Sequence, residues 1–108
     1  MPHLRFRAVE EDIVKSLSGP LAEALSFALN CPADYFTFEH IKTAFYFGGE
    51  AVKGIPTIEV IWFDRGQEAQ DLTAQMLHEA ILANGYEETT LIFTPLFKSA
   101  YYDNGQHY

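Results

Sequence analysis

The order of predicted structural elements repeats once along this chain of 108 residues. Residues 1–54 predict a strand, a helix and a strand, and residues 55–108 predict the same order, so a shift of 54 positions places Pro2 on Pro56. Identity between the halves is low, and a chance likeness of two amphipathic units is the alternative explanation. We expect two strand-helix-strand units, each a right-handed crossover between parallel strands, in one α+β domain over residues 1–108. Such a domain has a four-stranded mixed sheet with two helices on one face.

Four segments carry strand patterns. Apolar and polar residues alternate over 4–8 and over 56–63, which is the period of a half-buried strand. The segment 35–47 is rich in aromatic and β-branched residues and precedes the turn signal Gly48–Gly49, so it predicts a long or bent strand. A short apolar segment at 91–93 predicts the last strand of the sheet.

Apolar residues at intervals of three or four predict two helices. The first follows the acidic cluster Glu10–Asp12, and Gly19–Pro20 predicts either a kink or a restart with Ser18 as the cap. The second ends at Asn84–Gly85, a typical left-handed cap. The apolar stripes are Ile13, Leu17, Leu21, Ala24 and Ala28 in the first helix, and Ala69, Leu72, Met76 and Ala80, flanked by Leu77 and Ile81, in the second.

The tail predicts a small terminal hairpin within residues 101–108. Asn104–Gly105 stands there between aromatic residues, and this dipeptide is a strong signal for a two-residue hairpin turn.

Charge and composition argue against several classes of partner and site. Fifteen Asp and Glu against seven Lys and Arg give a net charge of −8, which opposes binding to nucleic acid or to an anionic membrane. No segment reaches the roughly 18 to 20 apolar residues of a membrane span, and the start of the chain lacks the apolar region of a secretory signal. Cys31 is the only cysteine, so we expect no internal disulfide, no zinc site and a reducing, cytoplasmic location.

The most distinctive chemical feature is Pro2. Removal of Met1 before this small residue exposes a secondary amine at the start of a strand. No glycine-rich phosphate loop, nucleophile elbow or metal-binding helix motif accompanies it, and the four histidines are scattered. We therefore expect chemistry without a metal or a cofactor.

Several motifs resemble those of the tautomerase superfamily, which includes macrophage migration inhibitory factor. The resemblance covers nearly the whole chain in element order, and its most specific points are Met1-Pro2, Pro32–Tyr35, Gly66–Gln67 and the aromatic, Asn-containing tail. The likeness is greatest to an uncharacterised bacterial family of that superfamily, through the stretches Asp34–Phe36, Trp62–Glu68 and Tyr101–Gly105.

This resemblance implies a homotrimer of tautomerase-like subunits that needs no cofactor. Pro2 is then the general base that moves a proton between carbon and oxygen of a keto-enol pair, on a small 2-oxo acid or enol. An α-amino group has a reference pKa of about 7.7 to 8.0, and an apolar pocket disfavours its charged form. A neutral amine near pH 7 is suited to this proton transfer.

The resemblance also implies two substrate-binding residues. Tyr35 matches a tyrosine that helps to wall the pocket. Ile61 matches a position whose backbone amide reaches the substrate.

Recognition of the substrate's charge departs from the family pattern. The lysine that some relatives place before a proline is Cys31 here, and Leu91 and Phe93 replace a polar pair on the last main strand. Among the arginines that could replace these groups we favour Arg65, at the end of the third predicted strand. A solvated ion pair with a neighbouring carboxylate is the alternative role for Arg65.

Two other functions stay open. Retention of Met1 leaves the Pro2 nitrogen as an amide without a basic lone pair, which favours a non-catalytic trimer that binds a partner or a small ligand. A protonated Pro2 instead suits an acid in decarboxylation or hydration.

Overall fold

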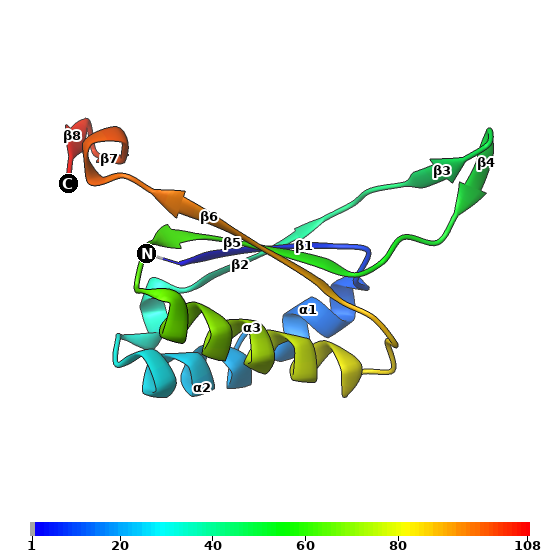
Figure 1. Cartoon of the computed structure of the whole chain (residues 1–108), viewed down its shortest axis with the longest axis horizontal. Coiled ribbons are helices and arrows are strands. Elements are labelled where there is room, and N and C mark those ends of the chain that lie inside the picture. Colours follow the sequence, from blue (N-terminus) through cyan, green and yellow to red (C-terminus); the bar gives the residue numbers. More distant parts are fainter. Residues whose placement is uncertain (1) are drawn as a thin grey trace.

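The computed structural model describes residues 2–108 and is shown in Figure 1. Its elements, in chain order, are β1 (His3–Arg7), α1 (Glu11–Leu17), α2 (Pro20–Leu29), the 3-10 helix η1 (Ala33–Tyr35), β2 (Thr37–Ile41), β3 (Phe45–Phe47), β4 (Glu50–Val52), β5 (Thr57–Phe63), α3 (Gln67–Leu82), β6 (Thr90–Leu96), the 3-10 helix η2 (Lys98–Ala100), β7 (Tyr102–Asp103) and β8 (Gln106–His107).

The central sheet has four strands in the order β2-β1-β5-β6. β1 is parallel to β2 and β5 is parallel to β6, whereas the two inner strands, β1 and β5, are antiparallel. Each parallel pair is joined through helices, so the chain forms two βαβ units that meet at β1 and β5. This arrangement confirms the predicted α+β class and the mixed four-stranded sheet.

Three helices, rather than two, cover one face of the sheet (Figure 1). The first apolar stripe is divided at Gly19–Pro20 between α1 and α2. Of the two predicted alternatives, the restart of the helix is therefore confirmed and the kink is wrong. Pro20 opens α2, where its missing N–H would have no helical partner. Gly19 holds the cap position, and the Ser18 hydroxyl instead donates to the Lys15 carbonyl at 2.7 Å. Within residues 2–108, no helix is long and apolar enough to cross a membrane.

The core lies between the helices and the sheet. Alternate residues of β1 and β5 point into it and are fully buried, and the residues between them face away and stay half-buried. The period of two predicted for these strands is therefore confirmed. The strand residues of the core are Leu4, Phe6, Ile58, Val60 and Trp62, and the helices add Val14, Leu21, Ala22, Leu25, Leu77 and Ile81.

The buried side of α3 is centred one position away from the predicted stripe. Thr73, Leu77 and Ile81 are buried, whereas Leu72 is 45% exposed. The Thr73 hydroxyl donates to the Ala69 carbonyl at 2.8 Å. Because this bond satisfies the hydroxyl, a threonine is tolerated on the side of α3 that faces the core.

The predicted strand over 35–47 is too long, because the structure divides this segment. Tyr35 belongs to η1, and β3 pairs with β4 in a separate antiparallel hairpin. We call this hairpin, residues 45–52, the arm; it projects away from the sheet in Figure 1. The turn signal is confirmed, since Gly48 and Gly49 have φ angles of 58° and 80° between the two strands.

The predicted terminal hairpin is confirmed. β7 and β8 pair antiparallel, and Asn104 and Gly105 between them have φ angles of 53° and 82°. Positive φ at both central residues is the requirement of a tight hairpin turn. In Figure 1 the hairpin lies at the end of the molecule where the chain begins.

Candidate functional site

Pro2, the predicted base, lies at the start of β1 with its side chain fully buried. It continues the alternation of the strand, so its ring lies on the same side of β1 as Leu4. Its carbonyl accepts the Thr37 N–H at 3.1 Å, and the Pro56 carbonyl likewise accepts the Thr90 N–H at 2.8 Å. The two prolines therefore hold equivalent places in the two units, and only Pro2 stands next to the start of the chain.

His3 faces the opposite side of β1 and contacts two other segments. Its Nδ1 is 2.7 Å from Thr37 Oγ1, and its Nε2 is 3.3 Å from the Tyr101 hydroxyl. The imidazole also stacks on the Tyr101 ring, with 6.3 Å between ring centroids. His3 thus connects the start of β1 with the start of β2 and with the tail of the chain.

An aromatic cluster formed by Phe63, Tyr101 and Tyr108 surrounds this contact. Tyr101 meets Phe63 edge to face at 5.3 Å and Tyr108 edge to face at 5.0 Å, and Phe63 stacks on Tyr108 at 5.5 Å. The Tyr108 N–H also donates to the Tyr101 carbonyl at 3.1 Å. Offset and edge-to-face pairs of this kind stabilise beyond the area they bury. The cluster therefore holds the tail against the end of β5.

Two titratable groups of this region have shifted pKa values. Burial lowers the pKa of His3 below 6.5, and the positive amino terminus lowers it further, against the opposing effect of Asp103 and Glu39. A hydrogen bond to the Asp103 carboxylate raises the pKa of the Tyr108 phenol above 10.0. Both side chains are therefore predominantly neutral at pH 7, and the neutral imidazole offers one donor and one acceptor nitrogen.

Tyr35 and Ile61 lie at the same end of the sheet as Pro2. Tyr35 closes η1 and is 42% exposed, and one residue, Phe36, separates it from β2. β2 begins beside His3 because Thr37 is its partner in the parallel pair. Ile61 is directly opposite His3 in the antiparallel β1-β5 pair. The register of the strands therefore brings three of the four predicted site residues, Pro2, Tyr35 and Ile61, to the same end of the sheet.

Arg65 has different surroundings. It follows β5 and lines a groove of about 410 Å³ between α2 and α3, together with Leu29, Glu68 and Leu72. This groove is on the helix side of the sheet, which is also the side of the Pro2 ring. Within residues 2–108, Arg65 forms no ion pair, so the alternative of a pair with its carboxylate neighbours is not seen.

The sheet face opposite the helices carries a charged network. Arg5 Nε donates to Glu39 Oε1 at 3.0 Å, and Glu59 Oε1 lies 3.7 Å from Arg5 Nη1 and 3.5 Å from Arg7 Nη2. The Thr94 hydroxyl donates to Glu59 Oε2 at 2.9 Å. No helix of the described chain covers this face (Figure 1). Although no helix covers this face, its arginine and glutamate side chains are paired with one another.

Sequence reasoning did not assign His3, Thr37, Phe63 or Tyr101 to a site. The alternating pattern of β1 could have indicated His3, because it places that side chain on the face opposite the core. No local pattern links His3 to Tyr101, which is 98 positions away.

The chemistry that this end of the sheet offers is proton transfer and hydrogen bonding. Its groups are the imidazole of His3 and the hydroxyls of Thr37 and Tyr101. Within residues 2–108, no cluster of three or more His, Cys, Asp or Glu side chains could hold a metal ion.

Comparison with known proteins places this geometry in a family. The model of the Domain of unknown function (DUF1904) matches residues 1–107. The crystal structure of a DUF1904 domain from Sebaldella termitidis is 40% identical, covers 100% of both chains and superimposes with a TM-score of 0.94. No curated protein matches the chain.

Two further solved structures share the fold at low identity. One is the macrophage migration inhibitory factor-like protein of Entamoeba histolytica, which is 18% identical over 99% of this chain and 98% of that chain, with a TM-score of 0.73. The other is a fused 4-OT wild-type asymmetric trimer, 18% identical over 97% of this chain and 94% of that chain, with a TM-score of 0.81. These likenesses establish the tautomerase-like fold that the sequence predicts.

Proposed function

The chain belongs to the Domain of unknown function (DUF1904) family, and we propose that it is a cofactor-independent keto-enol tautomerase whose general base is the amine of Pro2. The substrate class is a small 2-oxo acid or its enol. One observation carries the proposal: the proline next to the start of the chain is fully buried at the head of β1. The shared fold supports it.

Burial explains how Pro2 can act as a base. Removal of Met1 converts its nitrogen from an amide into a secondary amine with a lone pair. Apolar surroundings disfavour the charged form, so the pKa of the amine falls toward neutrality. The lone pair takes the proton from the carbon next to a carbonyl, the C–H electrons form the C=C bond of the enolate, and the proton is returned to oxygen. The reverse sequence converts the enol into the ketone.

Three residues complete the proposed site. Tyr35 walls the pocket, the Ile61 amide donates to the enolate oxygen, and Arg65 binds the carboxylate of the substrate. The antiparallel β1-β5 pairing supports the role of Arg65, because the end of β5 lies beside the start of β1. The groove that Arg65 lines is also on the same side of the sheet as the Pro2 ring.

We further propose that the functional unit is a homotrimer. The exposed aromatic residues of the arm, Tyr46 (70% exposed) and Phe47 (80% exposed), support association, because exposed apolar patches mark interaction sites. The 4-OT structure with the same fold is described as a trimer. Light scattering at micromolar concentration should return three times the mass of one chain, and a monomer mass would remove this part of the proposal.

Enol-to-keto conversion of phenylenolpyruvate tests the activity. Protein whose intact mass shows loss of Met1 should accelerate the conversion, and protein that keeps Met1 should have a kcat/KM lower by about 100-fold or more, which is the usual contribution of a general base. Pro2→Ala replaces the secondary amine by a primary one and should also be slower than wild type. Pro56→Ala is the matched control, since Pro56 holds the equivalent buried place in the second unit. It should keep the wild-type rate if it folds. Equal rates for protein with and without Met1 contradict the proposal.

The burial of Pro2 also favours a second candidate, a non-catalytic trimer that binds a partner or a small ligand. In that case Pro2 is simply a core residue of β1. Intact-mass analysis of protein from its native host separates the two functions, because retention of Met1 on essentially all chains leaves no basic amine. An active protein that converts 2-oxo acids only by loss of CO2, or that hydrates them, would instead point to a protonated Pro2 acting as an acid.

A further inference from the structure

The dipeptide Asn-Gly occurs twice in the chain, as Asn84–Gly85 and as Asn104–Gly105. The first follows α3, and the second forms the turn between β7 and β8. All four residues are exposed, and open space lies where a Cβ would stand on either glycine. Neither solvent access nor crowding at the glycine therefore distinguishes the two places.

An Asn-Gly dipeptide can lose its side-chain amide without an enzyme, and asparagine is a thermolabile residue in part for this reason. The glycine nitrogen gives up its proton and attacks Cγ of the asparagine. The bond from Cγ to the side-chain nitrogen breaks, and that nitrogen leaves with the proton as ammonia. Water then opens the succinimide ring at either carbonyl, which gives aspartate or isoaspartate, whose backbone runs through Cβ. Glycine favours the attack because it has no Cβ in the way.

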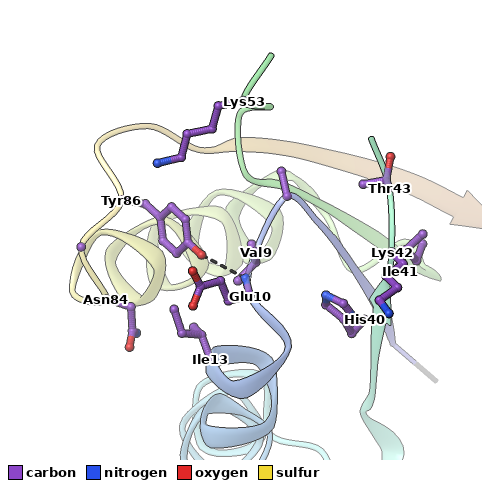
Figure 2. Close-up of a pocket in the computed structure, with 12 residues that line it drawn as sticks. Val9, Glu10, Ile13, His40, Ile41, Lys42, Thr43, Lys53, Asn84 and Tyr86 are labelled. Atoms are coloured by element: carbon purple, nitrogen blue, oxygen red, sulfur yellow. Dashed lines mark hydrogen bonds between the residues drawn. The ribbon is translucent and has the colours of Figure 1, made fainter. Parts of the chain in front are cut away.

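The reacting groups of Asn84 and Gly85 are both hydrogen-bonded. Asn84 Nδ2 donates to the Ala80 carbonyl at 2.8 Å. The Gly85 N–H donates to the Leu82 carbonyl at 3.1 Å. Figure 2 shows Asn84 just after α3 and, two residues on, Tyr86, whose hydroxyl accepts a backbone N–H from the segment before α1 at 3.0 Å. The attack needs both bonds of the dipeptide to break within a loop that is itself tied down.

The same groups of Asn104 and Gly105 take part in no hydrogen bond within residues 2–108. The attack requires rotation about the Asn104 backbone, so the turn must open first. β7 and β8 have two residues each and pair only with each other. Because so short a hairpin has little stability of its own, its turn opens at low cost.

We propose that Asn104 is a site of spontaneous deamidation and that Asn84 is not. The two dipeptides have the same residues, so residue type alone assigns them equal reactivity. Their hydrogen bonds separate them, because the reacting groups are held after α3 and are free in the turn of the tail. Water is the only co-reactant, and it replaces the ammonia that leaves.

Deamidation at Asn104 should open the tail. Both products add a negative charge next to Asp103, whose carboxylate accepts the hydrogen bond of the Tyr108 phenol. Isoaspartate also lengthens the backbone of a two-residue turn, so the register of β7 and β8 is lost. The contacts of Tyr108 with Phe63 and Tyr101 depend on that hairpin. The reaction therefore releases, with time, the tail that the aromatic cluster holds against the end of β5.

Peptide mass mapping of the full chain, aged in mildly alkaline buffer, tests the site. Asn104 should convert to aspartate and isoaspartate about tenfold faster than Asn84 or more, since the reaction at Asn84 must first break two hydrogen bonds. Synthetic peptides of residues 101–108 and 81–88 are the matched reference, because neither is long enough to fold, and they should convert at similar rates. Equal rates at the two sites of the folded protein contradict the proposal, and so does a difference between the peptides as large as that in the protein.

Two variants connect the reaction with the fold of the tail. Asn104→Gly removes the carboxamide and keeps a residue suited to the φ angle of 53°, so amide hydrogen exchange in its tail should stay the same on ageing, whereas that of aged wild type should become faster. Tyr101→Ala should speed the conversion of Asn104 and leave that of Asn84 unchanged.

Two results of these variants would overturn the proposal. One is an aged Asn104→Gly whose tail loses protection as wild type does. The other is an unchanged rate at Asn104 in Tyr101→Ala when its tail amides exchange faster. All of these measurements are independent of the Pro2 reaction, so they stand whether or not the protein is a tautomerase.

Discussion

The imidazole of His3 stacks on the ring of Tyr101, and its Nε2 lies 3.3 Å from the Tyr101 hydroxyl. Phe63 and Tyr108 pack on the same tyrosine. β7 and β8 pair only with each other and not with the central sheet. The tail is therefore held beside the proposed site mainly by contacts between side chains.

Replacement of Tyr101 should release the tail without unfolding the sheet. Tyr101→Ala removes three ring contacts, each worth about 0.5 to 1.5 kcal/mol, so amide hydrogen exchange in residues 101–108 should become faster than in wild type. Tyr101→Phe keeps the rings and loses only the hydroxyl, and its exchange should stay close to that of wild type. Unchanged protection in Tyr101→Ala would show that other contacts hold the tail.

His3 should make the stability of the protein depend on pH. Folding lowers the pKa of His3, so the unfolded chain binds a proton more readily than the folded one. The His3 contribution is therefore fully present above about pH 6.5, declines as the pH falls below that value, and levels off below the folded-state pKa.

Urea unfolding of His3→Asn at pH 7.5 and pH 5.5 measures this contribution. The free energy of unfolding should fall less between these pH values in His3→Asn than in wild type. His107→Asn is the control, because His107 lies in the exposed tail hairpin, and it should keep the wild-type difference. If His3→Asn loses as much stability as wild type, the imidazole does not titrate with a lowered pKa.

Ala8→Gly should stabilise the folded chain. A left-handed conformation costs an L-residue about 1 to 2 kcal/mol, and glycine avoids this cost but loses more backbone entropy on folding. With Ala8 at a φ angle of 60°, the net gain in the free energy of unfolding should be up to about 1 kcal/mol, measured by urea unfolding. Ala8→Val should be destabilised by more than that, since a β-branched residue fits this region worse than alanine. A loss of stability in Ala8→Gly would show that the turn is unstrained.

Alternation and turn chemistry account for what the sequence predicted correctly. Leu4 and Phe6 alternate with charged residues because one face of β1 meets the core, and Asn104–Gly105 suits the positive φ angles of its turn. The division of the segment 35–47 escaped prediction because no glycine or proline marks residues 42–44. Where β2 ends and the arm begins depends on pairing with β1 and β4, which no local pattern encodes.

Only the part of the candidate site at the ends of the strands could be predicted from the sequence. The position of Pro2 at the head of a strand follows from the alternation, and the family resemblance added Tyr35 and Ile61. The contact of His3 with Tyr101 depends on how the tail folds back over the end of β5. Residue spacing alone therefore could not predict this contact.

Gly54→Ala should weaken assembly if the arm joins subunits of the proposed trimer. A Cβ at position 54 would overlap the ring of Phe45, the half-buried first residue of β3, so the ring must move and the base of the arm must shift. The concentration at which the trimer dissociates should rise by about tenfold or more, as for loss of a central interface contact. Light scattering over a dilution series measures it. Gly19→Ala is the control, because Gly19 has open space for a Cβ and a φ angle of −86°. A displaced Phe45 ring with unchanged dissociation would place the interface elsewhere than on the arm.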